Sequence, residues 1–168
     1  MEYVNIFVKS LLIENMVFAY FLGMCSFLAV SKKVPTAVGL GAAVIFVQVI
    51  TVPLNYLIYK YVLEPGALKW IDPSFEALDL SFLTFILFIA SVATMVQLVE
   101  MIIEKYSPSL YNSLGLFLPL IAVNCAILGG SLFMQQRIDA GVYSNMGHVL
   151  TFAFASGLGW AIAIILMA

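Results

Sequence analysis

The chain has 168 residues, of which 64% are apolar and only 10% are charged, and its mean hydropathy is +1.10. A soluble domain carries about a quarter charged residues and far fewer apolar ones, so a water-soluble monomer is excluded. Seven basic residues against nine acidic ones give no positive field for nucleic acid, and two cysteines cannot form a disulfide framework. The composition therefore predicts an integral membrane protein.

The charged residues fall in clusters, and the apolar stretches between them are long enough to cross a bilayer. A hydrocarbon core of ~30 Å requires roughly 20 apolar residues in a helix. These stretches are solidly apolar rather than alternating, which argues against a β-barrel. The sequence predicts a single all-α membrane domain over residues 1–168, with five helices at about 4–31, 35–60, 80–104, 109–133 and 145–168.

The distribution of basic residues predicts an orientation. The short loop with Lys32 and Lys33 has the highest density of positive charge, and such loops favour the cytoplasmic side. The N-terminus and the acidic loop at about 61–79 are then expected outside. The first helix lacks the basic leader and cleavage site of a secretory signal, so we expect it to be retained.

Two similar strings begin at Cys25 and Cys125, one hundred positions apart. In both, a leucine follows three positions after the cysteine and a serine six positions after it. The first and second helices then correspond to the fourth and fifth, and a three-helix unit must insert its second copy in the inverted orientation. We expect one repeat at about 1–104 and another at about 105–168. The third helix of the second repeat would lie beyond residue 168, so we expect either that a sixth helix has been lost or that the chain is a truncated form, and the apolar end at 166–168 favours truncation.

Helix-breaking residues accompany both cysteines. Gly23 lies two positions before Cys25, and Pro119 lies six positions before Cys125. Proline removes a backbone donor and clashes with the preceding turn. In straight helices the two sulfur atoms would lie at different depths in the membrane. The first and fourth helices are therefore predicted to be broken near their cysteines.

The two cysteines have a purely structural and a functional interpretation. Most cysteines in membrane helices simply pack as small apolar residues. Repeat-equivalent positions beside helix breaks favour ligands instead, and thiolates suit zinc, copper(I) or iron–sulfur clusters. Zinc and 2Fe–2S sites usually need four donors, and no histidine lies near Cys25 or Cys125 in the sequence. A complete site would require a second chain.

Several stretches resemble the Rnf/Nqr family of membrane subunits. They cover the predicted first, third and fourth helices, at 21–25 with 29–33, at 96–101, at 107–115 and at 117–130. The most specific is the Val-Asn-Cys-Ala block at 123–126, which follows Leu-Pro-Leu. Within the family, residues 13–16 and the Gly129–Gly130 pair are more similar to the branch of Na⁺-translocating NADH:quinone reductases than to the Rnf branch.

The resemblance implies a subunit of a redox-driven sodium pump in the bacterial inner membrane, an NADH:ubiquinone reductase. It implies that the chain pairs with a homologous D-type subunit, inserted the other way up. Each of the two chains would give two cysteines, here Cys25 and Cys125, to one shared intramembrane 2Fe–2S cluster that relays electrons. NAD, FAD, FMN and quinone would bind only to other subunits, so the chain would not be catalytic alone. The sequence itself contains no dinucleotide-binding fingerprint.

Charged groups within membrane helices are expensive and are functional candidates by default. Glu100, with Gln97 one turn earlier, offers two hard oxygens as a candidate Na⁺ site, although Glu100 equally well marks a helix end. Glu14 lies deeper in its predicted helix. Its charge is expected to be compensated by the partner subunit or to serve transport.

The remaining polar positions have local interpretations. Asn124 is expected to hydrogen-bond either backbone freed at the helix break or a cluster sulfur. His148 has no acid or cysteine near it in the sequence and is expected at the membrane interface. Gly157 and Gly159 are expected to be close helix-packing positions.

Two rival functions remain open. A small secondary transporter is one alternative, because inverted repeats with discontinuous helices are common in that class. A structural membrane subunit without a cofactor, whose cysteines merely pack, is the other.

Overall fold

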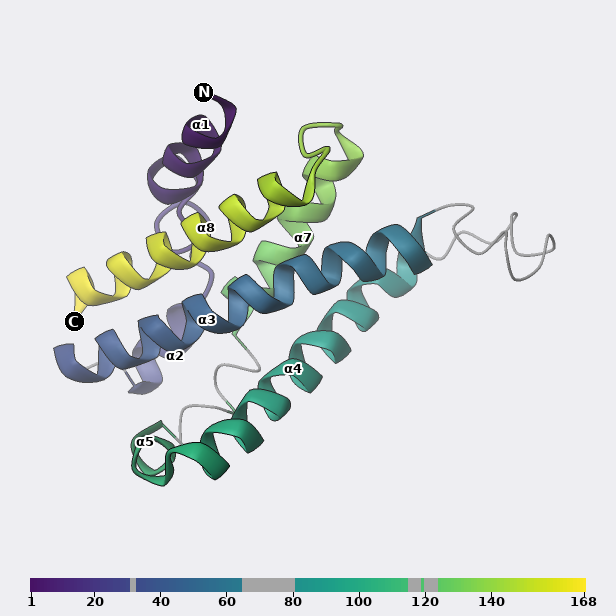
Figure 1. Cartoon of the computed structure of the whole chain (residues 1–168). Coiled ribbons are helices and arrows are strands. Elements are labelled where there is room, and N and C mark those ends of the chain that lie inside the picture. Colours follow the sequence, from purple (N-terminus) through teal and green to yellow (C-terminus); the bar gives the residue numbers. More distant parts are fainter. Residues whose placement is uncertain (31–32, 65–80, 115–118, 120–123) are drawn as a thin grey trace.

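The computed structural model describes residues 1–30, 33–64, 81–114, 119 and 124–168 (Figure 1). Helices joined by short irregular segments make up this part of the chain, and it contains no β-strand. The helices are α1 (Glu2–Val8), continued by the π-helical turn η1 (Lys9–Ile13); α2 (Met24–Val30); α3 (Val34–Ile58), continued by η2 (Tyr59–Leu63); the short η5 (Ser81–Leu83); α4 (Thr84–Tyr106); α5 (Pro108–Leu114); α7 (Cys125–Asp139); and α8 (Met146–Met167). The predicted all-α class is confirmed.

Three of the described helical stretches are long and apolar enough to cross a membrane. They are Val34–Leu63, Thr84–Tyr106 and Met146–Met167. They match the predicted helices at 35–60, 80–104 and 145–168, although residue 80 lies outside the described residues. Long apolar stretches without internal charge predict helices reliably, because the bilayer requires every backbone group to be hydrogen-bonded within its own segment.

The other two predicted helices are interrupted, as the helix-breaking residues indicate. The predicted helix at 4–31 is α1 with η1, an irregular stretch over 14–23, and then α2. The predicted helix at 109–133 begins as α5 and ends as α7, and Asn124 immediately before α7 has an extended backbone. Most of the segment around Pro119 lies outside the described residues. The breaks are observed, whereas the repeat relationship between them stays a prediction.

Helices α3 and α8 pack closely along each other and form the centre of the bundle (Figure 1). A Cβ atom at Gly41 would lie 2.9 Å from the Cβ atom of Ala161, and one at Gly157 would lie 3.3 Å from the Cα atom of Ile45. Small residues let two membrane helices approach until their backbones touch. The prediction that Gly157 is a close packing position is confirmed.

The two cysteine-bearing helices, α2 and α7, run in opposite directions. The end of the molecule with the N-terminus also holds the end of α3 and the α7–α8 turn, whereas the start of α3 and the C-terminus lie at the other end (Figure 1). Helix α2 leads from the first break towards the start of α3, and α7 leads from Asn124 towards the N-terminal end. Both helices thus begin inside the bundle and end at opposite ends of it.

Candidate functional site

The first interruption is held together by Asn15. Its Oδ1 accepts from the backbone N–H groups of Val17 at 3.0 Å and Phe18 at 3.5 Å, and its Nδ2 donates to Leu11 O at 3.2 Å and to Gly159 O at 2.8 Å. A helix break leaves backbone groups unpaired, and in a membrane interior these must find partners. The buried Asn15 side chain supplies them and fastens the break to α8.

The end of this interruption has a backbone conformation that few residues adopt. Phe21 has a φ of 55° and Gly23 a φ of 85°. The indole of Trp160 packs on Gly23 so closely that a Cβ atom there would lie 2.1 Å from Nε1. Only glycine satisfies both the left-handed backbone and this approach. The chain then enters α2, where Cys25 lies in the first turn with its side chain exposed.

Asn124 defines the second interruption. Its backbone is extended (φ −71°, ψ 114°), and its Oδ1 accepts a 3.0 Å hydrogen bond from the backbone N–H of Ala126, which caps α7. Of the two roles expected for Asn124, the one towards freed backbone is confirmed, and the one towards a cluster sulfur stays a prediction. Cys125 is the first residue of α7, and its side chain is exposed.

The segment before Cys25 packs directly on the helix that begins with Cys125. A Cβ atom at Gly129 would lie 2.6 Å from Cδ1 of Leu22, and the rings of Tyr20 and Phe133 have their centroids 4.5 Å apart. Leu22 and Cys125 also line one shallow hollow, together with Leu128, Gly129, Leu132, Phe133 and Gln136. The segment that leads to Cys25 therefore packs against the face of α7 that carries Gly129 and Phe133, and this contact connects the two cysteine-bearing segments.

These two thiols are an incomplete ligand set. Both cysteines are free, and the described part of the chain contains no group of three or more His, Cys, Asp or Glu side chains that would hold a metal ion. Two thiols at an exposed surface are compatible with the expectation that further donors come from another chain. That expectation stays a prediction.

Glu14 finds its counter-charge within the chain, contrary to the expectation of a partner subunit. Its carboxylate forms ion pairs with Arg137 near the end of α7 and with Lys9 at 3.3 Å. Arg137 also donates to Tyr143 Oη at 2.6 Å, and its guanidinium lies over the ring of Phe152 at 5.3 Å from the centroid. No sequence pattern indicates this arrangement, because Arg137 is remote from Glu14 along the chain. Burial raises the pKa of Tyr143, although Arg137 opposes this shift, so the phenol is neutral near pH 7.

Two further predicted positions have different outcomes. Glu100 is half-buried and Gln97 exposed on α4. A Na⁺ ion at Glu100 stays a prediction. His148 has an acid near it after all, because α1 brings Glu2 Oε2 to 3.7 Å from Nε2 and the ring centroid of Tyr3 to 4.8 Å from that of His148. Its place at the membrane interface stays a prediction.

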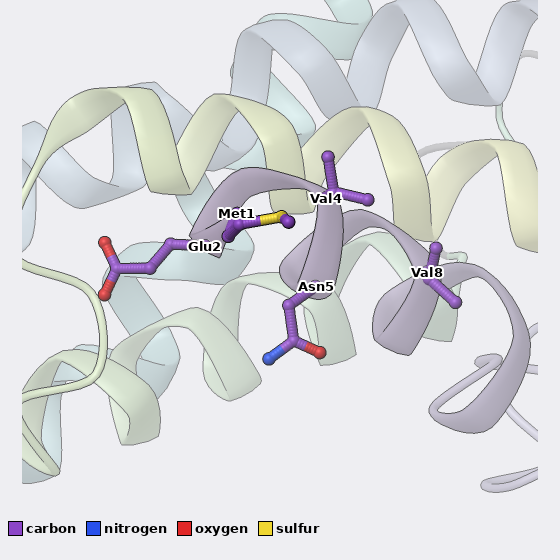
Figure 2. Close-up of a pocket in the computed structure, with 5 residues that line it drawn as sticks. All are labelled: Met1, Glu2, Val4, Asn5 and Val8. Atoms are coloured by element: carbon purple, nitrogen blue, oxygen red, sulfur yellow. The ribbon is translucent and has the colours of Figure 1, made fainter.

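A second hollow lies along α1, and its geometry does not define a site. Figure 2 shows that its lining side chains point in different directions; they come from α1 and the residue just before it, namely Met1, Glu2, Val4, Asn5 and Val8. Binding sites usually gather a few convergent polar groups from several elements. This surface therefore contributes nothing to the cysteine site.

The fold and site define a class: a helical membrane protein with two interrupted helices, each presenting one exposed thiol at the start of its second half. Residues 3–168 match the family model described as "Rnf-Nqr subunit, membrane protein". The chain belongs to this family of membrane subunits.

Its relatives include proteins named as the E-type subunit of Na(+)-translocating NADH-quinone reductase. The protein of this name from Stutzerimonas stutzeri is 54% identical over 167 residues, which cover 99% of this chain and 79% of the relative. That from Maridesulfovibrio salexigens is 57% identical over 165 residues, which cover 98% of this chain and 78% of the relative. The resemblance found from the sequence motifs is confirmed.

Proposed function

We propose that this chain is a membrane subunit of a Na⁺-translocating NADH:quinone reductase. In this proposal it relays electrons through an intramembrane 2Fe–2S cluster that it shares with a homologous D-type subunit. The names and high identity of its relatives support the assignment to the complex. The proposal places the complex in the bacterial inner membrane, with the N-terminus on the outer side. NAD, FAD, FMN and quinone belong to the other subunits.

One observation carries the cluster part of the proposal: both cysteines lie exposed in the first turn of a helix that follows an interruption, and the two segments contact each other. Thiolates are the usual ligands of 2Fe–2S clusters, which require four donors. Two cysteines from each of two homologous chains meet that number. When bound, the cluster supplies a one-electron carrier inside the membrane.

The residues around the cysteines suit such a group. The positive end of the α7 dipole lies beside Cys125 and favours a negatively charged group bound there, because anions are stabilised at helix N-termini. Asn15 and Asn124 hold the two interruptions by hydrogen bonds to backbone, so the thiols are presented by fixed segments. Rigid supporting residues are what a ligand set needs in order to keep its geometry through oxidation and reduction.

The experiment replaces each cysteine by serine in the assembled, purified reductase complex. Cys25→Ser and Cys125→Ser are each expected to abolish the 2Fe–2S signal in electron paramagnetic resonance, to lower the iron content and to stop quinone reduction. Met24→Leu, beside Cys25 in the same turn, is the control and should retain all three. An unchanged iron signal in both serine variants would refute the relay role. Na⁺ transport by the isolated subunit in liposomes would favour a secondary transporter instead.

A further inference from the structure

A row of buried polar side chains follows one face of α3 through the interior of the bundle. Gln48, Thr51 and Asn55 are each 0% exposed, and their spacings of three and four residues bring them to the same face. Ser131 of α7 and Ser156 of α8 are equally buried and lie against this row. Buried polar groups in membrane bundles either fasten helices together or line a path for a polar solute.

The Asn55 end of the row fastens helices. Asn55 Nδ2 donates to Ser131 Oγ at 2.7 Å, and Asn55 Oδ1 accepts from the hydroxyl of Ser91 on α4. The Ser131 hydroxyl in turn donates to Ile127 O at 3.3 Å. Every polar atom of the Asn55 side chain therefore has a partner, and this end is explained by helix packing.

The Gln48 end is different, because two oxygen atoms there have no partner among the described residues. Gln48 Nε2 donates to Ser156 Oγ at 2.6 Å, and Ser156 Oγ donates its single proton to Ala153 O at 3.3 Å. Ser156 must therefore accept from the Gln48 amide, which fixes Oε1 on the opposite side. The two unpartnered atoms are Gln48 Oε1 and Thr51 Oγ1, and both are buried. Such atoms are costly in an apolar interior and indicate a bound water or ion.

Glycines leave room for this amide group. A Cβ atom at Gly130 would lie 2.8 Å from Gln48 Nε2, and one at Gly157 would lie 3.4 Å from Gln48 Oε1. Gly130 belongs to α7, the helix that begins with Cys125. Gln48 Oε1 thus lies where α3, α7 and α8 meet, next to the helix that carries one proposed cluster ligand, and Thr51 follows three residues later on the same face of α3.

We propose that Gln48 Oε1 and Thr51 Oγ1 are ligands of a Na⁺ site inside this subunit. Neutral hard oxygens suit a hard cation. The Thr51 hydroxyl is not committed to any carbonyl of its own helix, so its oxygen lone pairs are available to the ion. Water supplies the remaining ligands. The inference rests on the proposed function as part of a sodium pump, and it places an ion site between α3 and α8, away from Glu100 on α4.

The test measures the Na⁺ concentration that half-saturates NADH:quinone reductase turnover in the purified complex. Thr51→Val removes one oxygen at nearly constant volume and should raise this concentration by about tenfold, which corresponds to ~1.4 kcal/mol of binding free energy. Gln48→Leu should raise it further. Thr151→Val is the matched control, because the Thr151 hydroxyl already donates to Gly147 O at 2.9 Å, and it should leave the concentration unchanged.

The outcomes separate this inference from the proposed function. All three variants should retain the 2Fe–2S signal, since none of them replaces a cysteine. If Thr51→Val has the same half-saturating Na⁺ concentration as Thr151→Val, the pocket holds only water and the inference is overturned. If Gln48→Leu fails to assemble, the conservative Thr51→Val decides alone. Loss of Na⁺ response in Thr51→Val with an intact iron signal supports the site, whereas absence of that signal from the unsubstituted complex overturns the proposed cluster instead.

Discussion

Asn15 Nδ2 donates a 2.8 Å hydrogen bond to the backbone carbonyl of Gly159, which lies 144 positions further along the chain. This single bond joins the interruption of the first predicted helix to the middle of α8. Gly159 can accept it only because it lacks a side chain: a Cβ atom there would lie 2.8 Å from Leu11 O and 3.1 Å from Asn15 Nδ2. The packing role predicted for Gly159 is therefore more specific than helix contact. It holds the segment that leads to Cys25.

Gly159→Ala is expected to displace the first interruption. The added methyl group meets a backbone oxygen that cannot move aside, and such overpacking typically costs about 1–3 kcal/mol. The apparent unfolding temperature of the purified complex should fall, and the 2Fe–2S signal should weaken. Gly147→Ala on the same helix is the control, because the nearest atoms to its methyl group would be those at the far end of the movable Tyr3 side chain, from the hydroxyl at 3.1 Å to the ring carbon Cζ at 3.6 Å. Equal effects of the two variants would contradict this account.

The ion pair of Glu14 with Arg137 is expected to contribute more to stability than the pair with Lys9. Both partners in the first pair have side chains only 18% exposed, whereas Lys9 is 50% exposed. Arg137→Gln leaves a poorly solvated carboxylate without its main partner and should lower the unfolding temperature clearly, while Lys9→Gln should change it little. The double variant Glu14→Gln/Arg137→Gln should be less destabilised than the sum of its single variants. Additive effects would show that the two side chains are not coupled.

Two substitutions of Asn124 should show whether its capping hydrogen bond, rather than the volume of its side chain, stabilises the start of α7. Asn124→Ala removes the acceptor for the Ala126 N–H at the start of α7, a loss of about 1 kcal/mol for a typical N-cap. Asn124→Asp keeps an acceptor and adds a charge that the helix N-terminus favours. The measurement is the hydrogen-exchange rate of the backbone amides in the first turn of α7, which reports local unfolding near Cys125. This rate should increase in the alanine variant and not in the aspartate variant. Equal protection in both variants would exclude a capping role.

Gly23→Ala should be far more damaging than Gly141→Ala. Both glycines have positive φ angles, 85° and 74°, so both substitutions strain the backbone. A Cβ atom at Gly23 also meets the Trp160 indole at 2.1 Å, whereas one at Gly141 would meet none of the described residues within 4 Å. The yield of assembled complex with bound iron is the measurement. A comparable loss in Gly141→Ala would mean that backbone strain alone explains the effect.

Much of the architecture was readable from the sequence, because the bilayer imposes simple requirements. Apolar stretches without charge had to be helices, and three of them agree closely with α3, α4 and α8. Gly23 correctly indicated an interrupted helix beside Cys25, and the extended backbone of Asn124 confirms the interruption predicted beside Cys125, whereas a break at Pro119 itself stays a prediction. The exact breaks were less accessible, since the irregular stretch from Glu14 to Gly23 depends on hydrogen bonds from Asn15 to backbone that the sequence does not display.

The sequence by itself determined the class, the family and the two thiols, because composition, hydropathy and local motifs are properties of neighbouring residues. Only the tertiary structure decided which remote groups meet: Glu14 with Arg137, His148 with Glu2, and Gln48 with Ser156. These contacts depend on how closely α1, α3, α7 and α8 approach one another. That approach is set by glycines whose significance appears only when the opposing atoms are known.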